Sequence, residues 1–182
     1  MKSRLLKTGL AGVAAVMLGA GSLMAHDNGD DNDHGHDRSK FFVSADLIGF
    51  QEVPALSTVA HGHFSAWVDT KANTITYRLT YDALEGTVQQ SHVHFGQKSV
   101  SGGVSFFLCS NLANGPAGTA LCPAGPAEVT GVVTPDLIVG PNAQGIEPAA
   151  FAEIVAAMRD GTAYANVHSS KWPAGEIRGQ LH

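Results

Sequence analysis

Short runs of alternating apolar and polar residues, separated by turn-forming residues, recur along most of this chain. In 61–69, for example, Phe64, Ala66 and Val68 share one face of a strand, because successive side chains of a strand point to opposite faces. The pattern predicts about eight strands, at 41–48, 61–69, 74–81, 87–95, 102–108, 128–133, 162–168 and 176–181. Local spacing without strand–helix alternation predicts an all-β fold, an antiparallel β-sandwich or barrel with Greek-key-like order.

One segment, 148–160, follows the period of a helix instead of a strand. Its apolar side chains recur on one helical face, at Phe151, Ile154, Val155 and Met158. Proline suits the first position of a helix and glycine suits the position after its end. We therefore expect one short helix that begins at Pro148 and stops at Gly161.

The N-terminus has the composition of an export signal. Three cations precede a short apolar run, and small residues up to Ala25 offer a cleavage point. We expect 1–25 to be a signal peptide and the mature protein to be periplasmic or secreted. The acidic, histidine-bearing segment 26–40 lacks large apolar side chains, which predicts a disordered tail before a folded domain at 41–182.

Charge limits the class of partner. Removing the three cations of the signal leaves eight basic against 16 acidic side chains, a net charge of −8. This excess argues against nucleic acid or an anionic membrane as the main partner. The apolar run is too short to cross a bilayer, and no cysteine stands at the cleavage point, so we expect no membrane anchor. The sequence leaves the oligomeric state open.

The chain has two cysteines, Cys109 and Cys122, at either end of a loop rich in Gly, Ala, Asn and Pro. An oxidising compartment favours their pairing as a disulfide. A thiol pair for redox or metal chemistry is the alternative, but the spacing is far from C-x-x-C. We therefore expect a structural bridge.

Histidine is the unusual residue type, with nine in the chain. In His92-Val-His94 the two imidazoles share one face of a strand, about 7 Å apart at Cα, and can converge on one ion. In 162–168, Asn166 and His168 also share a face with each other. Imidazole nitrogen suits copper and zinc, and three histidines with water or a fourth ligand form a complete site.

A second pair, His61 and His63, lies on another predicted strand. It has three possible roles: ligands of the same site, a second site, or side chains in solvent. His182 ends the chain, where we expect a solvated role. His26 becomes the first residue after cleavage and could chelate copper through its amine and ring, but the mobile tail favours only weak, exposed metal binding.

Other templates for catalysis fit poorly. The chain lacks G-x-S-x-G, a phosphate-binding loop and a dinucleotide fingerprint, and neither cysteine has the context of a nucleophile. Glu52, Glu176 and Arg178 can form an internal ion pair, which we interpret as structural because buried charges need partners. We expect a non-catalytic domain.

Five segments occur in an order that resembles the CHRD domain, named for chordin. They are 51–54 (QEVP), 79–81 (LTY), 92–94 (HVH), 161–168 (GTAYANVH) and 175–181 (GEIRGQL). The resemblance covers 41–182 and implies an all-β domain of extracellular proteins, in which binding is the usual expectation and catalysis is not an established trait. The Cys-to-Cys loop departs from the family pattern. His92-Val-His94-Phe-Gly is also similar, over five residues, to the copper-ligand strand of copper-zinc superoxide dismutase.

The leading hypothesis is an exported, non-catalytic metal-binding domain, with copper as the ion and zinc as the alternative. Its ligands are His92, His94 and His168, with His61 or His63 as the fourth. A second hypothesis is an interaction or matrix module for another exported protein, with structural histidines and recognition by the loops around 97–125 and 140–147. A third is a copper enzyme of the superoxide dismutase type.

Overall fold

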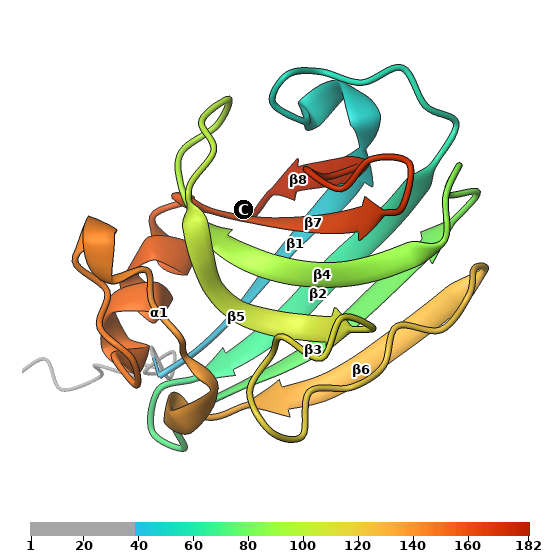
Figure 1. Ribbon diagram of the computed structural model, residues 1–182. Coiled ribbons are helices and arrows are strands. Elements are labelled where there is room, and N and C mark those ends of the chain that lie inside the picture. The colour runs from blue at the N-terminus through green and yellow to red at the C-terminus, as the bar shows by residue number, and fades with distance from the viewer. Residues whose placement is uncertain (1–38) are drawn as a thin grey trace, which may run out of the picture. The chain divides into compact units, whose positions relative to one another are not determined.

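The structure, a computed structural model, describes residues 39–182. This part of the chain forms eight strands, one α-helix and three 3-10 turns (Figure 1). The strands are β1 (Lys40–Ile48), β2 (His61–Asp69), β3 (Thr74–Asp82), β4 (Val88–Phe95), β5 (Gly103–Ser110), β6 (Ala127–Val133), β7 (Ala163–Ser169) and β8 (Ile177–Gln180). The helix is α1 (Phe151–Arg159), and the turns are η1 (Gly49–Gln51), η2 (Pro135–Leu137) and η3 (Asn142–Gln144). The predicted signal peptide, His26 and the tail up to residue 38 lie outside the described residues.

The strands form one antiparallel sheet in the order β5-β4-β7-β8-β1-β2-β3-β6. The two edge strands, β5 and β6, also contact each other, so the sheet curls into a nearly closed barrel (Figure 1). Across the interior, the Tyr77 hydroxyl on β3 donates to the Leu108 carbonyl on β5 at 2.7 Å. The predicted antiparallel all-β fold is confirmed, and its form is barrel-like. β7 returns to pair with β4 after β5 and β6, which is a Greek-key-like order.

Alternation along the strands produces the core. On β2, Phe64, Ala66 and Val68 are buried inside the barrel, while Trp67 between them is exposed. β3 follows the same rule, with Ile75 and Leu79 fully buried. Each strand therefore contributes one apolar face to a shared interior, which is the burial that stabilises a sheet of this kind.

Three neighbouring strands, β4, β7 and β8, are covered on both faces. All seven residues of β7 are buried, although its side chains alternate between apolar and polar along much of its length. The outward face of these strands carries polar side chains, namely His92, His94, Asn166, His168 and Arg178. Contacts from the loop after β4 and the loop after β7 reach these side chains. A buried polar layer therefore lies outside the barrel wall at this position.

The helix begins later than predicted. Ala149 adopts a left-handed conformation, with φ of 67°, and its N–H donates to the Ile138 carbonyl. This contact holds the chain out of helical geometry, so the expectation that Pro148 begins the helix is wrong. The predicted end is confirmed, because Gly161 with φ of 73° follows the C-cap residue Asp160.

No helix in residues 39–182 combines the length and the apolar character needed to cross a bilayer.

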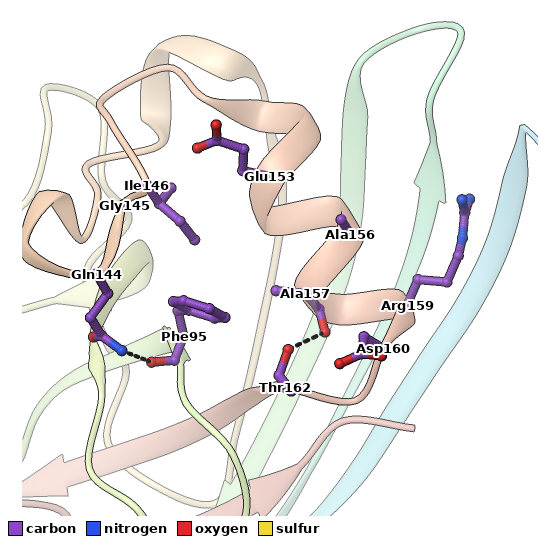
Figure 2. A pocket seen from close by; sticks show the side chains of 10 residues that line it. All are labelled: Phe95, Gln144, Gly145, Ile146, Glu153, Ala156, Ala157, Arg159, Asp160 and Thr162. Atoms are coloured by element: carbon purple, nitrogen blue, oxygen red, sulfur yellow. Dashed lines mark hydrogen bonds between the residues drawn. The ribbon is translucent and has the colours of Figure 1, made fainter. Parts of the chain in front are cut away.

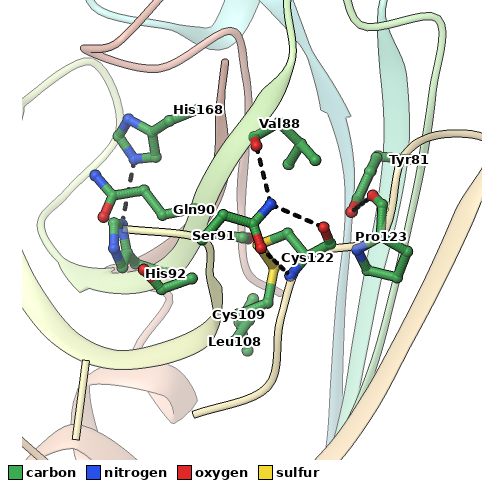
Figure 3. Close-up of a disulfide and its surroundings, with 12 residues drawn as sticks. Tyr81, Val88, Gln90, Ser91, His92, Leu108, Cys109, Cys122, Pro123 and His168 are labelled. Atoms are coloured by element: carbon green, nitrogen blue, oxygen red, sulfur yellow. Dashed lines mark hydrogen bonds between the residues drawn. A yellow bond between two sulfur atoms is a disulfide. The ribbon is translucent and has the colours of Figure 1, made fainter. Parts of the chain in front are cut away.

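The predicted disulfide is confirmed. Cys109 on β5 is bonded to Cys122, and both side chains are buried. Asn111 fixes the loop between them, since its side chain donates to the Val88 and Cys122 carbonyls and accepts from the Cys122 N–H. Figure 3 shows the bridge beside β4, the strand that carries His92. Both sulfur atoms are committed to this bond and are not available as metal ligands.

Candidate metal centre

The register between β4 and β7 brings the three predicted histidines together. The antiparallel ladder places Gln90 opposite His168 and His92 opposite Asn166. His92, His94 and His168 therefore lie on one face of two adjacent strands, as the alternation along each strand requires. One ring nitrogen of each lies within 4.8 Å of the others, and all three residues are buried. This cluster could hold a metal ion.

Backbone carbonyls fix the orientation of two of the rings. His94 Nδ1 lies 2.9 Å from the Gly102 carbonyl, and His168 Nδ1 lies 3.0 Å from the Pro173 carbonyl. A carbonyl only accepts, so each Nδ1 carries the hydrogen, and a neutral ring then has its lone pair on Nε2. An imidazole held through one nitrogen and free to ligate through the other is the usual arrangement at metal sites.

The remaining ring nitrogens meet near Asn166. The Nε2 atoms of His94 and His168 each lie 3.1 Å from Asn166 Oδ1. His92 Nδ1 lies 3.2 Å from His168 Nε2, the contact drawn as a dashed line in Figure 3. His92 also packs edge-on against Phe107 of β5, with ring centroids 4.5 Å apart. The potential ligand atoms thus face a common point.

Burial keeps the three imidazoles neutral. It lowers the pKa of His92 to about 2, with repulsion from His168 and His94 adding to the effect. Burial likewise lowers the pKa of His94 to about 4 and lowers the pKa of His168, with hydrogen bonds to the Gly102 and Pro173 carbonyls acting in the opposite direction. A ring that is already neutral at pH 7 can bind a metal ion without first releasing a proton.

The metal-free protein is expected to lose stability on acidification from pH 6.5 to 5. Unfolded histidines bind protons near pH 6.5, whereas His92 and His94 in the folded state stay neutral to about pH 2 and 4, so lower pH favours the unfolded state. Glu52 acts oppositely, because burial raises its pKa to about 7 and the folded state keeps a proton that the unfolded state releases above about pH 4.5. His92 and His94 against one carboxyl give a net loss of about 1 kcal/mol per pH unit, and the lowered pKa of His168 adds to it in the same direction.

Urea denaturation in the presence of a chelator, at several pH values in this range, measures that slope. His92→Leu should reduce the slope by about 1 kcal/mol per pH unit, because it removes one of the titrating rings. His61→Gln is the matched control at an exposed histidine. Equal slopes in the two variants would contradict the assignment of the acid sensitivity to the cluster.

A stack of side chains supports His94 from the neighbouring strands. The Tyr164 ring lies parallel to the His94 ring, with centroids 4.7 Å apart, and the Arg178 guanidinium lies over Tyr164 at 3.4 Å. Arg178 also donates to the carbonyls of Gln97 and Val100. Arg178 therefore connects β8 to the loop whose Gly102 carbonyl orients His94.

Glu52 enters the same buried layer from the segment after η1. Burial raises the pKa of its carboxyl to about 7, while the Val53 N–H, the charge of Arg178 and the Asn166 side chain act in the opposite direction. Its Oε1 has no hydrogen-bond partner. The predicted internal ion pair of Arg178 stays a prediction, and Glu176 accepts from the Thr58 hydroxyl and the Glu85 N–H.

The structure does not bring His61 and His63 to the cluster. Both lie on β2, and β8 and β1 separate β2 from β7. Neighbouring strands are about 4.8 Å apart, so β2 lies roughly 14 Å from β7 along the sheet. The His63 ring contacts Asp46 at 2.8 Å, and His61 Nδ1 contacts the Val59 carbonyl at 3.3 Å. This strand order corrects the expectation that His61 or His63 completes the site.

The last histidine, His182 at the C-terminus, is exposed, and its ring contacts the Gln180 carbonyl.

The groups that orient the cluster had little signature in the sequence. The Gly102 and Pro173 carbonyls are backbone groups, so no residue type identifies them. Asn166 did have a signature, since it shares a strand face with His168, but an amide alone does not indicate a ligand. Glu52 lies in the segment 51–54, which the resemblance to the CHRD domain singled out without assigning it a role.

A separate surface groove of about 740 Å³ lies between α1 and the segment around η3 (Figure 2). Phe95 and Ile146 give it an apolar floor, and Glu153, Arg159 and Asp160 contribute its charged groups. Its lining contains neither histidine nor cysteine. The groove includes part of the 140–147 loop, but it does not gather groups suited to metal binding or nucleophilic chemistry.

Comparison with known proteins supports one assignment. Searches of curated proteins and of solved structures found no match to this chain. The sequence profile of the CHRD domain matches residues 43–181, which is nearly all of the β domain described above. The match includes all three strands of the buried polar layer, β4, β7 and β8. On this evidence the chain belongs to the CHRD domain family.

Proposed function

We propose that this protein is an exported, non-catalytic metal-binding domain whose ligands are His92, His94 and His168. One observation carries the proposal: the ligand nitrogens of the three buried rings lie within 4.8 Å of one another. Carbonyl contacts at the Nδ1 atoms of His94 and His168 leave their Nε2 atoms free to bind an ion. The disulfide and the CHRD fold support an extracellular or periplasmic location.

Copper is the ion that we propose, with zinc as the alternative. Imidazole suits both metals, and among divalent first-row ions copper binds a given nitrogen site most tightly. Burial supports a binding role over a catalytic one, because the three residues are only 3–7 % exposed and a bound ion would have little contact with substrate. The same burial disfavours an enzyme of the superoxide dismutase type, which needs an open coordination position.

Metal content and affinity test this proposal directly. Protein from 26–182, purified without a histidine tag, should bind about one equivalent of Cu(II) or Zn(II) tightly in titration calorimetry and elemental analysis. His92→Ala and His168→Ala should each lower the affinity at least about 100-fold, because each removes one of three imidazole ligands. The His61→Ala/His63→Ala double variant is the matched control and should retain the tight equivalent.

Binding that survives in His92→Ala and His168→Ala, but is lost in the control, would overturn the assigned site. A wild-type protein without tight binding would overturn the function. The second hypothesis, recognition of another exported protein, is favoured in that case by the groove beside the 140–147 loop. Glu153→Lys at that groove should then weaken capture of a partner from the periplasm or medium.

A further inference from the structure

The side-chain oxygen of Asn166 occupies an unusual position in the buried cluster. Asn166 Oδ1 lies 3.1 Å from His94 Nε2 and 3.1 Å from His168 Nε2. Asn166 is 3 % exposed, and it lies on β7 between Tyr164 and His168 on the same face. An amide oxygen only accepts hydrogen bonds, so its neighbours need to be donors or a cation.

The two histidines cannot both donate to it. A neutral imidazole carries one N–H, and the carbonyls of Gly102 and Pro173 already take the hydrogens on the Nδ1 atoms. Both Nε2 atoms therefore present lone pairs toward the lone pairs of Asn166 Oδ1. Second protons would relieve this conflict only by placing two like charges in a buried space, where repulsion and desolvation oppose them.

The neighbour on the other side of Asn166 accounts for this orientation of the amide. The Asn166 side chain and the charge of Arg178 both lower the pKa of Glu52 and so favour its carboxylate form. A carboxylate accepts hydrogen bonds, so the amide nitrogen is the Asn166 atom turned toward it. Turning the amide around would place Oδ1 against that carboxylate. With the amide in this orientation, Oδ1 and the Nε2 atoms of His94 and His168 crowd together, and none of these three atoms carries a hydrogen.

We propose that Asn166 Oδ1 is the fourth ligand of the metal ion, which completes a site of three nitrogens and one oxygen. This inference rests on the proposed function and deepens it. Metal–nitrogen bonds of about 2.0–2.1 Å place the ligand atoms of a tetrahedral site about 3.3 Å apart. The observed separations, 3.1 Å for both Oδ1 contacts and 3.2 Å between His92 Nδ1 and His168 Nε2, are close to that value.

The ligand set also selects the ion. An oxygen and three imidazoles, without a thiolate or thioether, match Zn(II) or Cu(II) better than the softer Cu(I). Glu52 orients the amide without being a ligand itself, and its carboxylate adds negative charge beside the ion. The site that we infer therefore takes a divalent ion.

Two variants at Asn166 and one control variant at an asparagine outside the cluster test the assignment. Asn166→Ala should lower the affinity for Zn(II) about tenfold or more, because water replaces a held ligand. Asn166→Asp keeps the shape and supplies a charged oxygen, so it should retain the affinity or raise it. Its Cu(II) complex should also give an electron paramagnetic resonance spectrum different from that of the wild type. Asn142→Ala is the matched control, because it removes the side chain of an exposed asparagine outside the cluster and should leave the affinity unchanged.

A measurement on the unaltered chain makes the result independent of how the variants fold. In the Zn(II) complex, the Asn166 side-chain carbonyl carbon should shift in the NMR spectrum by more than the corresponding carbon of Asn111, which lies in the disulfide loop. If wild-type protein binds Zn(II) but this carbon does not shift, and Asn166→Ala keeps full affinity, Asn166 is not a ligand and the three-histidine proposal stands. Absence of tight binding in the wild type overturns both.

Discussion

Saturation with Zn(II) is expected to raise the midpoint of thermal unfolding of the protein by about 8–16 °C at pH 7. A ligand that binds only the folded state adds RT ln(1 + [L]/Kd), which is about 4 kcal/mol at a thousand times Kd. For a domain of this size, each kcal/mol moves the midpoint by roughly 2–4 °C. The shift should be this large because the three ligands lie on two strands that are far apart in sequence and come together only in the folded state.

Circular dichroism melts with zinc, and again after excess chelator, measure the shift and its reversal. His168→Ala should melt at nearly the same temperature with and without zinc, whereas the His61→Ala/His63→Ala variant should show the full shift. A version that begins at residue 39 separates the contribution of histidines in the N-terminal segment. Equal shifts in wild type and His168→Ala would show that the stabilising ion binds elsewhere.

The strands were predictable because their signal is local. Alternation in 61–69 and 74–81 follows directly from which side chains enter the interior, and the structure has strands at His61–Asp69 and Thr74–Asp82. The start of the helix was less predictable, since Ala149 is held by a hydrogen bond to Ile138, a residue outside the helical pattern. Local periodicity contains no information about such a contact.

The candidate site was also predictable only where its signal lies within a single strand. That His92 and His94 share a face follows from the two-residue period of a strand, and so does the shared face of Asn166 and His168. Which strands become neighbours is a property of the whole sheet. The order β4-β7-β8-β1-β2 brings His168 beside the first pair and keeps His63 away, and nothing within the individual motifs specifies that order.

Replacement of Arg178 by methionine is expected to lower the free energy of unfolding by about 3–5 kcal/mol, because it removes two hydrogen bonds from a charged group that contribute about 1.5–3 kcal/mol each. Arg178 is 2 % exposed, and its loss leaves the carbonyls of Gln97 and Val100 without their donor. The guanidinium also lies 3.4 Å from the Tyr164 ring and favours ionised Glu52. Methionine keeps much of the apolar bulk, so the expected loss reflects charge and hydrogen bonds more than a cavity.

Arg78→Met is the matched control, because Arg78 pairs with Glu128 at 2.7 Å but both side chains are about half exposed. A surface ion pair of this kind contributes about 1 kcal/mol or less, so urea denaturation should separate the two variants clearly. Adding Glu52→Gln to Arg178→Met should recover part of the loss, because the second change removes the carboxyl that Arg178 had balanced. If Arg178→Met is no more destabilising than Arg78→Met, the stability of the buried polar layer does not depend on this guanidinium. The orientation of His94 must then come from its contact with the Gly102 carbonyl alone.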